Sequence, residues 1–505
     1  MNADPKKTKK KGFVRRTVIP LGCFGTSLLI AFTAGAQNAV DEWATPITDP
    51  LRTLSPALKP RVSLPGDSEP WACHDQIPAS AQLSLIDAID LALCHNPQVK
   101  SAWANIKVQA AGLGEARAAY LPSVVASGSH MRDKTTYPGS YFSETTINNL
   151  SGNIGVNWRL FDFGGRRANL RAGEYLLQAA MASRDAVLQK TLATVISAYS
   201  DVQTSRENWQ TREKNEALLR EIIEITERRE AKGMSAKSDT LQAKTALAKA
   251  TLEKNRAKGA YDKAKAVLVY SLGLPPSTQV ELSNDVSNAI DMIRQDLQQW
   301  LDDTEKRHPA IVAGKLQVEA AKQKLVVTRA EGMPTLDFSG NYYENGRPSQ
   351  GASSIRSKET VIGFTVTVPI FSGFSQTYKV RGAQAQLEQK EQELQDTEHQ
   401  ILGEVIKAHA EAVASLNNLD ASQQLLSAAD EALSSVKRKF DRGAADLLEI
   451  LNAQSALLDA QQERIRCQSE WRSARLVLLA NSGMLGREYV REGSAMKPDR
   501  KSVAY

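Results

Sequence analysis

Residues that could perform catalysis or bind a metal ion are scattered along this 505-residue chain. Its histidines show no spacing typical of zinc ligands, and no segment has the pattern of a nucleophile motif or a phosphate-binding loop. Asp162-Phe163-Gly164 has the letters of a kinase motif, but the glycine-rich and catalytic loops that accompany it are absent. We therefore predict no catalytic residue, no metal site and no cofactor. The histidines are His74, His95, His130, His308, His399 and His409.

Two cysteines are placed to form a disulfide. Residues 1–36 have the basic head, the apolar run and the small-residue cleavage site of a secretory signal peptide. In the oxidising compartment that export implies, we expect Cys73 and Cys94, 21 residues apart, to be bonded. Cys467 has no evident mate and is expected to be a small buried residue.

The charge of the exported part gives no support for nucleic-acid binding. The whole chain has 63 Lys and Arg against 57 Asp and Glu. Residues 1–36 hold seven of the basic residues and one of the acids, which leaves 56 of each sign. A neutral chain is not attracted to phosphate backbones. The alternative to a cleaved signal is a retained membrane anchor, for which the apolar run 17–32 is short.

Two long helices are predicted from apolar residues that recur at every seventh position. The clearest run extends from Val380 to Phe440, with one step of four after Ile401. Sustained heptads are typical of a helix that packs along one seam, and the run is expected to end at the turn-forming Gly443. Segment 166–232, before Gly233, has the same design. At about 1.5 Å per residue, each helix is about 100 Å long.

Shorter helices and four strands complete the pattern. Apolar residues alternate with polar ones in 150–160, 336–342 and 362–370, which indicates strands with one apolar face, and 121–133 is the expected partner of the first. Helix 84–118, broken at Pro97, and helix 237–272 together match the length of one long helix. We therefore expect them to stack end to end beside it.

The chain is a tandem duplication, because the order helix, β-hairpin, long helix, turn, helix occurs twice. Predicted domains are the signal peptide 1–36, an extended lead-in 37–80, a first repeat 81–285, a second repeat 286–486 and a polar tail 487–505. Four strands with an apolar face cannot close alone in lipid, so copies must combine into 8 strands from two chains or 12 from three. The paired positions, 212 or 210 residues apart, are Pro97 with Pro309, Pro122 with Pro334, Gly233 with Gly443 and Gly273 with Gly483.

With these motifs in order, residues 80–486 resemble the TolC family of outer-membrane efflux proteins. The resemblance implies a mainly α fold with a β-barrel portion: a homotrimer whose 12-stranded barrel in outer-membrane lipid continues into a long periplasmic α-helical tunnel. It also implies a periplasmic membrane-fusion adaptor protein and, through it, an inner-membrane ABC transporter or pump. The segments that carry the resemblance are 83–97, Tyr120-Leu121-Pro122, 160–166, Gly332-Met333-Pro334, 368–373 and 442–453.

The resemblance places an entrance gate near the two glycine turns. Counting six residues from each glycine reaches Asp239 and Glu449, which match acidic positions of the family and would form rings of carboxylates in a trimer. Ordinary acids at a helix start are the other interpretation. Asn452 stands where another family acid is expected, so that ring loses its charge. The tip residues expected to dock on the adaptor are Lys232, Gly233, Met234, Arg442, Gly443 and Ala444.

The latch of this entrance is altered. Phe440 and Ala445 stand where the family has a tyrosine and an arginine that tether the closed state. We hypothesise that Arg442 or Asp446 provides a different latch.

Two segments indicate the cargo. Trp71-Ala72-Cys73 and residues 92–97 resemble members that serve type I protein secretion, so the predicted function is the exit duct of an ABC-type secretion system. A multidrug efflux channel is the alternative. A more distant alternative is an exported coiled-coil structural protein, which would explain the heptads but not the four strands.

Overall fold

The computed structural model describes residues 49–51, 53, 82–136, 138, 144–283, 296–347 and 356–486. The chain divides into two compact units, Met1–Pro50 and Leu51–Tyr505, and every helix and strand named below belongs to the second. The predicted signal peptide, most of the lead-in and the predicted tail lie outside the described residues.

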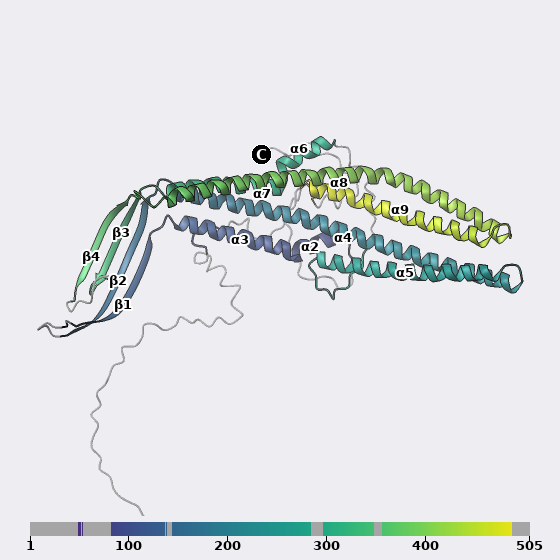
Figure 1. Cartoon of the computed structure of the whole chain (residues 1–505), viewed down its shortest axis with the longest axis horizontal. Helices are drawn as coiled ribbons and strands as arrows, with labels where there is room; N and C mark the ends of the chain where they lie inside the picture. Colours follow the sequence, from purple (N-terminus) through teal and green to yellow (C-terminus); the bar gives the residue numbers. More distant parts are fainter. Residues whose placement is uncertain are drawn as a thin grey trace, which may run out of the picture. The chain divides into compact units, whose positions relative to one another are not determined.

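Both repeats fold into the same series of elements (Figure 1). Corresponding helices have equal lengths of 11, 22, 67 and 35 residues, which confirms the tandem duplication. The first repeat contains α2 (Leu85–His95), α3 (Pro97–Ala118), β1 (Ser123–Thr135), β2 (Thr145–Phe161), α4 (Gly165–Ala231) and α5 (Lys237–Ser271). The second contains α6 (Leu297–Arg307), α7 (Pro309–Ala330), β3 (Thr335–Glu344), β4 (Lys358–Thr367), α8 (Ser375–Asp441) and α9 (Leu447–Asn481).

The long helices of this unit form a layer of four columns. Helix α4 packs against α3 and α5 on one side and against α7 and α9 on the other, and α8 packs beside α7 and α9. Helices α3 and α5 follow each other along α4, as do α7 and α9 (Figure 1). This is the end-to-end stacking expected from the helix lengths. It places the four strands at one end of the unit and the two helix turns at the other.

In the first repeat, the stacked helices meet at a glycine whose surroundings leave no room for a Cβ atom. Gly273 follows α5 with φ +73°, and a Cβ on it would lie 2.6 Å from the carbonyl oxygen of His95. Asn96 then joins the helix ends. Its side chain accepts a hydrogen bond from the backbone N–H of Gln98 (2.8 Å) and donates one to the carbonyl of Ser271 (2.9 Å). Pro97 begins α3, as predicted from its lack of an N–H donor.

In the second repeat, His308 takes the place of Asn96. Its Nδ1 accepts a hydrogen bond from the backbone N–H of Ala310 (3.3 Å), so it caps α7 as a neutral imidazole. Gly483, with φ +75°, lies against it. The side chain is buried, and this burial lowers the pKa of His308 to about 4.

Replacing His308 with asparagine is expected to keep the helix cap and to remove a pH dependence of stability. The folded pKa lies below the unfolded value, so the contribution of the neutral ring is complete above about pH 6.5 and is lost as the pH falls towards 4. At pH 4.5 the wild type should have lost roughly 2 kcal/mol that His308→Asn retains. Thermal unfolding of both proteins at pH 7.5 and 4.5 measures this; parallel losses in the two proteins would contradict it.

The four strands form one antiparallel sheet in the order β1-β2-β3-β4. Ile154 pairs with Tyr342, and Phe338 pairs with Phe364, so one face is apolar and exposed in the single chain. The opposite face is polar. There Arg159 Nε donates to Asp337 Oδ1 at 2.9 Å. The alternation in the sequence therefore predicted the two faces correctly.

The strand ends differ from the prediction, and proline is the reason. Strand β4 ends at Thr367, so its predicted extension to Ile370 is wrong. Pro369 has no N–H to continue the ladder. Similarly, β1 begins at Ser123, after Pro122, rather than at Leu121.

The junction between the sheet and α4 is held by one arginine. Arg166 donates to the carboxylate of Asp162 (3.1 Å) and to the carbonyls of Arg159 (2.6 Å) and Leu160 (3.1 Å). Its guanidinium also lies 4.9 Å from the centre of the Tyr120 ring. The long helix is thereby fixed to the end of the strand that precedes it.

None of the helices in the described part of the chain is both long enough and apolar enough to cross a membrane.

Candidate functional site

Both helix tips are closed by the same glycine turn. Gly233 has φ +68° and Gly443 has φ +75°, a conformation that suits glycine. At the first tip, the N–H groups of Gly233 and Met234 donate to the carbonyls of Glu230 (2.8 Å) and Arg229 (2.9 Å). This pair of hydrogen bonds ends a helix and turns the chain sharply. The second tip repeats it one repeat later. The residues proposed for docking therefore lie at two equivalent turns; of these, Lys232, Met234, Arg442 and Ala444 are exposed.

The predicted acids lie at the helix starts that follow these turns. Asp239 lies in the first turn of α5 and is half-buried, and Glu449 lies in the first turn of α9 and is exposed. Asp446 is the N-cap of α9, because its carboxylate accepts from the backbone N–H of Glu449 at 2.7 Å. Asn452 is exposed one turn further along. Asp446 thus has a capping role within its own helix, and Arg442 is exposed at the end of α8.

A contact between the two helical hairpins, α4–α5 and α8–α9, was not predicted from the sequence. Arg229, at the end of α4, donates to the carbonyl oxygen of Phe440 at 2.7 Å. Its guanidinium also lies 4.3 Å from the centre of the Phe440 ring, a cation–π distance. Phe440 is only 4% exposed, and its ring belongs to the apolar cluster between the hairpins. Phe440 stands at the position matched to the family's tether tyrosine. Its contact is with Arg229, an arginine from the other repeat.

Comparison of the two repeats in the sequence gives only a weak indication that Arg229 and Phe440 differ from their counterparts. Arg229 corresponds to Lys439, and Phe440 corresponds to Glu230 at the same offset. The aromatic ring at the end of one heptad run thus has no counterpart in the other. Only the fold shows that Arg229 and Phe440 meet.

A buried carboxylate joins α4 to α5 above the tips. Glu216 is 4% exposed and accepts from Lys254 (2.8 Å), Thr251 (2.7 Å) and Arg220 (3.0 Å). The hydrogen bond from Lys254, followed by that from Thr251, lowers the pKa of Glu216 from 4.5 to about 2. The heptad pattern could not identify this residue, because its partners lie on another helix.

Replacing Glu216 with glutamine is expected to lower the free energy of unfolding by about 2 kcal/mol at pH 7, since hydrogen bonds from charged groups are lost. The folded pKa is depressed, so the contribution is present above about pH 4.5 and is lost as the pH falls towards 2. Unfolding midpoints at pH 7 and 3 measure it. Glu213→Gln, an exposed site on the same helix, is the control. A deficit of equal size at both pH values would contradict the assignment.

Cys94 is disulfide-bonded. Its predicted partner, Cys73, lies outside the described residues, so this pairing remains a prediction. Cys467 is free and buried on α9, as expected.

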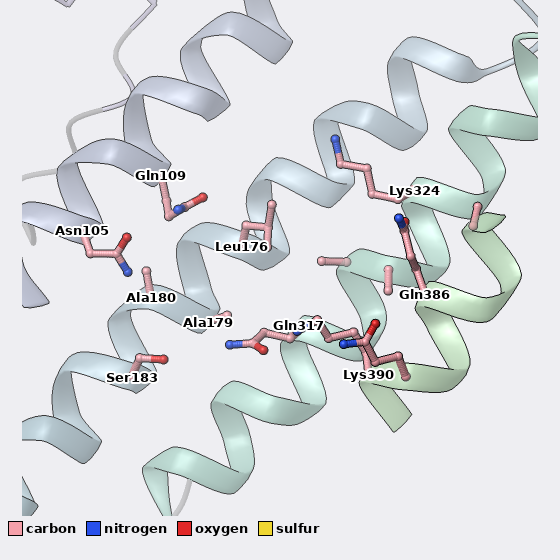
Figure 2. Close-up of a pocket in the computed structure, with 14 residues that line it drawn as sticks. Asn105, Gln109, Leu176, Ala179, Ala180, Ser183, Gln317, Lys324, Gln386 and Lys390 are labelled. Carbon is pink, nitrogen blue, oxygen red and sulfur yellow. The ribbon is translucent and has the colours of Figure 1, made fainter. Parts of the chain in front are cut away.

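A hollow of about 400 Å³ lies in the half of the helical layer nearer the sheet, between α3, α4, α7 and α8 (Figure 2). Its lining consists of Leu176, several alanines, and amide, hydroxyl and ammonium side chains. Such a lining suits water rather than an apolar ligand. No cluster of His, Cys, Asp or Glu in the described ranges could hold a metal ion. The polar lining residues are Asn105, Gln109, Ser183, Gln317, Lys324, Gln386, Gln389 and Lys390.

Comparison with known proteins identifies the family. The model of the outer membrane efflux protein family matches residues 88–274 and 300–483, which lie in both repeats. The chain belongs to the outer membrane efflux protein family.

Individual relatives agree with this assignment. CyaE of Bordetella pertussis is 33% identical, over 83% of this chain and 88% of that protein. The alkaline protease secretion protein AprF of Pseudomonas aeruginosa is 22% identical, over 80% of this chain and 85% of that protein. The CmeC outer membrane channel of Campylobacter jejuni has the same fold, with a TM-score of 0.70 at 19% identity, over 86% of this chain and 98% of that one.

Membership in the family places the chain in the outer membrane, with its helical part in the periplasm. The chain is an outer-membrane exit duct for export. The apolar face of the sheet is then the face towards lipid, and the polar face borders the path for cargo.

Proposed function

We propose that three copies of the chain form one duct, in which 12 strands close a barrel and the helical columns close a tunnel. The observation that carries this proposal is that the sheet of each chain has two open edges. Among the described residues, strands β1 and β4 each have one neighbour in the sheet, and unpaired strand edges are not tolerated in lipid. The two outer columns of the helical layer also have exposed apolar side chains. They include Ile406, Val413 and Leu416 on α8 and Val108, Val267 and Tyr270 on α3 and α5.

The duct is passive: it supplies a water-filled path and a gated entrance. Purified protein added to a planar lipid bilayer is expected to give discrete current steps of uniform size. The absence of such steps from protein that has inserted into the bilayer would contradict the proposal.

The tips at Gly233 and Gly443 are proposed to dock on a periplasmic adaptor, which connects the duct to an inner-membrane ABC transporter. Exposed apolar side chains at both tips support this, with Met234 at the first and Leu448 at the second. The amide and ammonium side chains that line the hollow of Figure 2 fit a path for hydrated cargo.

The cargo is proposed to be protein, exported by a type I secretion system. The support is the similarity to AprF, whose name assigns it to alkaline protease secretion. Deleting the gene should remove specific proteins from the culture medium and leave drug sensitivity unchanged. Unchanged secretion with increased drug sensitivity would favour multidrug efflux instead.

The entrance is proposed to be closed by Arg229 and Phe440. This pair joins α4 to α8 next to both turns, so it fixes one hairpin relative to the other. Adaptor contact would open the duct by separating the hairpins, a two-state motion. Arg442 and Asp446 are the alternative latch residues; Asp446 also caps its own helix α9.

The exposed carboxylate of Glu449 is proposed to form a cation-binding ring in the trimer. Glu449→Ala is expected to weaken the block of single channels by divalent cations about tenfold, because three carboxylates near the axis are removed together. Current recordings at increasing magnesium concentration measure this. Glu431→Ala, at an exposed site on α8 that lies further from the tip, should leave the block unchanged. Equal block in Glu449→Ala and wild type would exclude the ring.

A further inference from the structure

Charged residues of the two edge strands are sorted by face at the end of the sheet away from the helices (Figure 1). In β1, Arg132, Asp133 and Lys134 are consecutive, and β4 begins with Lys358 and Glu359. Successive residues of a strand point to opposite faces of the sheet. In both strands the sign of the charge therefore alternates in step with the pleat, and each strand has its cations on one face and its acid on the other.

The cation of β4 lies on the apolar face of the sheet. The pairing of β3 with β4 runs without a register shift from Glu344 and Lys358 to Phe338 and Phe364 and beyond. Lys358 is an even number of residues from Phe364, so the two share a face. This is the face that borders lipid.

The cations of β1 lie on the same face. The pairing of β1 with β2 is also free of register shifts, and Ala126 is the partner of Ile154 on the apolar face. Arg132 and Lys134 are each an even number of residues from Ala126. The apolar band of the sheet is thus followed by cations on the side towards lipid.

These cations are exposed and are only partly neutralised by nearby acids. Lys134 forms an ion pair with Glu144, and Glu344 stands opposite Lys358. Arg132 forms no ion pair with any residue that the structure describes. Three cations therefore stand against two acids, and Arg132 keeps its full charge.

Closure of the barrel would bring these cations together. Strands β1 and β4 are the two edges of the sheet, roughly 14 Å apart across three strand spacings. In the closed barrel proposed above, β1 of one copy lies beside β4 of the next. Arg132 and Lys134 of one copy then lie along the same seam as Lys358 of its neighbour, so the cluster is complete only between two copies.

We propose that each seam between copies binds the phosphates of lipid A, the phosphorylated glycolipid of the outer leaflet. The helices lie in the periplasm, so the opposite end of the sheet lies at that leaflet. Lysine and arginine are the side chains that bind phosphate, and the apolar band beneath them would contact the acyl chains. Bound lipid would hold neighbouring copies together from outside. The inference rests on the closed, membrane-inserted barrel proposed above.

Native mass spectrometry of the full-length protein, titrated with diphosphorylated lipid A in detergent, tests this. We expect one bound lipid A per seam in the wild type. Replacing the three cations together should weaken the binding about thirtyfold, because each cation close to an anionic lipid contributes separately. The substitutions are Arg132→Gln, Lys134→Gln and Lys358→Gln.

A matched control removes the same charge from exposed positions on the helices and should bind lipid A like the wild type. Dephosphorylated lipid A should bind the wild type as weakly as diphosphorylated lipid A binds the triple variant. An excess of inorganic phosphate should not displace lipid A, because the acyl chains share in the binding. The control substitutions are Lys249→Gln, Lys263→Gln and Lys407→Gln.

Several outcomes would overturn the inference. Equal binding by the wild type and the triple variant would exclude the cluster, and an equal loss in the control variant would reduce it to net charge. Displacement by inorganic phosphate would indicate a site for a free anion. The same spectra give the number of chains, so a failure to assemble in the wild type would instead contradict the proposed function. If the triple variant does not assemble, Arg132→Gln alone should weaken binding about threefold, and Arg132→Lys should retain it.

Discussion

Replacing Arg229 with alanine is expected to raise the conductance of the resting channel several-fold. Arg229 makes both a hydrogen bond to the Phe440 carbonyl and a cation–π contact with its ring, and this pair joins the two repeats close to both turns. A hydrogen bond from a charged donor and a cation–π contact together contribute roughly 2 to 3 kcal/mol. Three copies of this link in a trimer would bias the entrance strongly towards the closed state.

The internal repeat supplies the control for this prediction. Lys439 occupies the position in α8 that Arg229 occupies in α4, and its side chain is exposed. Lys439→Ala should therefore leave the conductance at the wild-type value in planar bilayer recordings. Phe440→Leu retains an apolar side chain and the backbone carbonyl, so its effect should lie between the other two. A latch at this pair would be refuted if the alanine variants at 229 and 439 behaved alike.

Replacing Gly273 with alanine is expected to lower the free energy of unfolding by about 3 kcal/mol or more. The residue combines a left-handed backbone with a Cβ position 2.6 Å from the His95 carbonyl oxygen. The neighbouring atoms are backbone and cannot move aside as a flexible side chain would. The substitution would therefore separate α5 from the junction of α2 and α3, where Leu93, Leu268 and Leu272 belong to the largest apolar cluster of the described residues.

Alanine substitutions at two other glycines serve as comparisons for the loss of stability at Gly273. Gly259 lies within α5 with open space around its Cβ position, so Gly259→Ala should raise stability by up to about 1 kcal/mol. Gly483→Ala meets Pro309 Cδ at 2.8 Å, and the loss should lie below that at Gly273 because a ring atom can shift slightly. Thermal unfolding of the three variants measures the order. A small loss at Gly273, similar to that of an exposed substitution, would contradict the packing described between Gly273 and the His95 carbonyl.

The elements were predictable because each rests on a repeated pattern. The heptads ending at Phe440 defined α8, and the alternation around Ile154 defined β2. The duplication then predicted the stacking of short helices beside long ones. Strand ends were less predictable, because alternation continues past Thr367 while the hydrogen-bond ladder ends there, two residues before Pro369.

The candidate site was only partly predictable, since its decisive contacts join distant segments. Asp239 and Glu449 follow from counting along the chain, but the link between Arg229 and Phe440 spans 211 residues. Glu216 looked like any charged residue on a long helix until its partners on α5 were known. The left-handed backbone of Phe163 and Phe374 could not be predicted from the sequence either, because a glycine, which adopts this conformation more readily, stands beside each of them.

The mass of the membrane-inserted particle tests the central claim most directly. Native mass spectrometry of the protein released from lipid nanodiscs gives the number of chains without assuming a structure. Because each chain supplies four strands with two open edges, we predict a particle of three chains, with no stable monomer in the bilayer. A membrane-inserted monomer or dimer as the main species would contradict the closed 12-stranded duct.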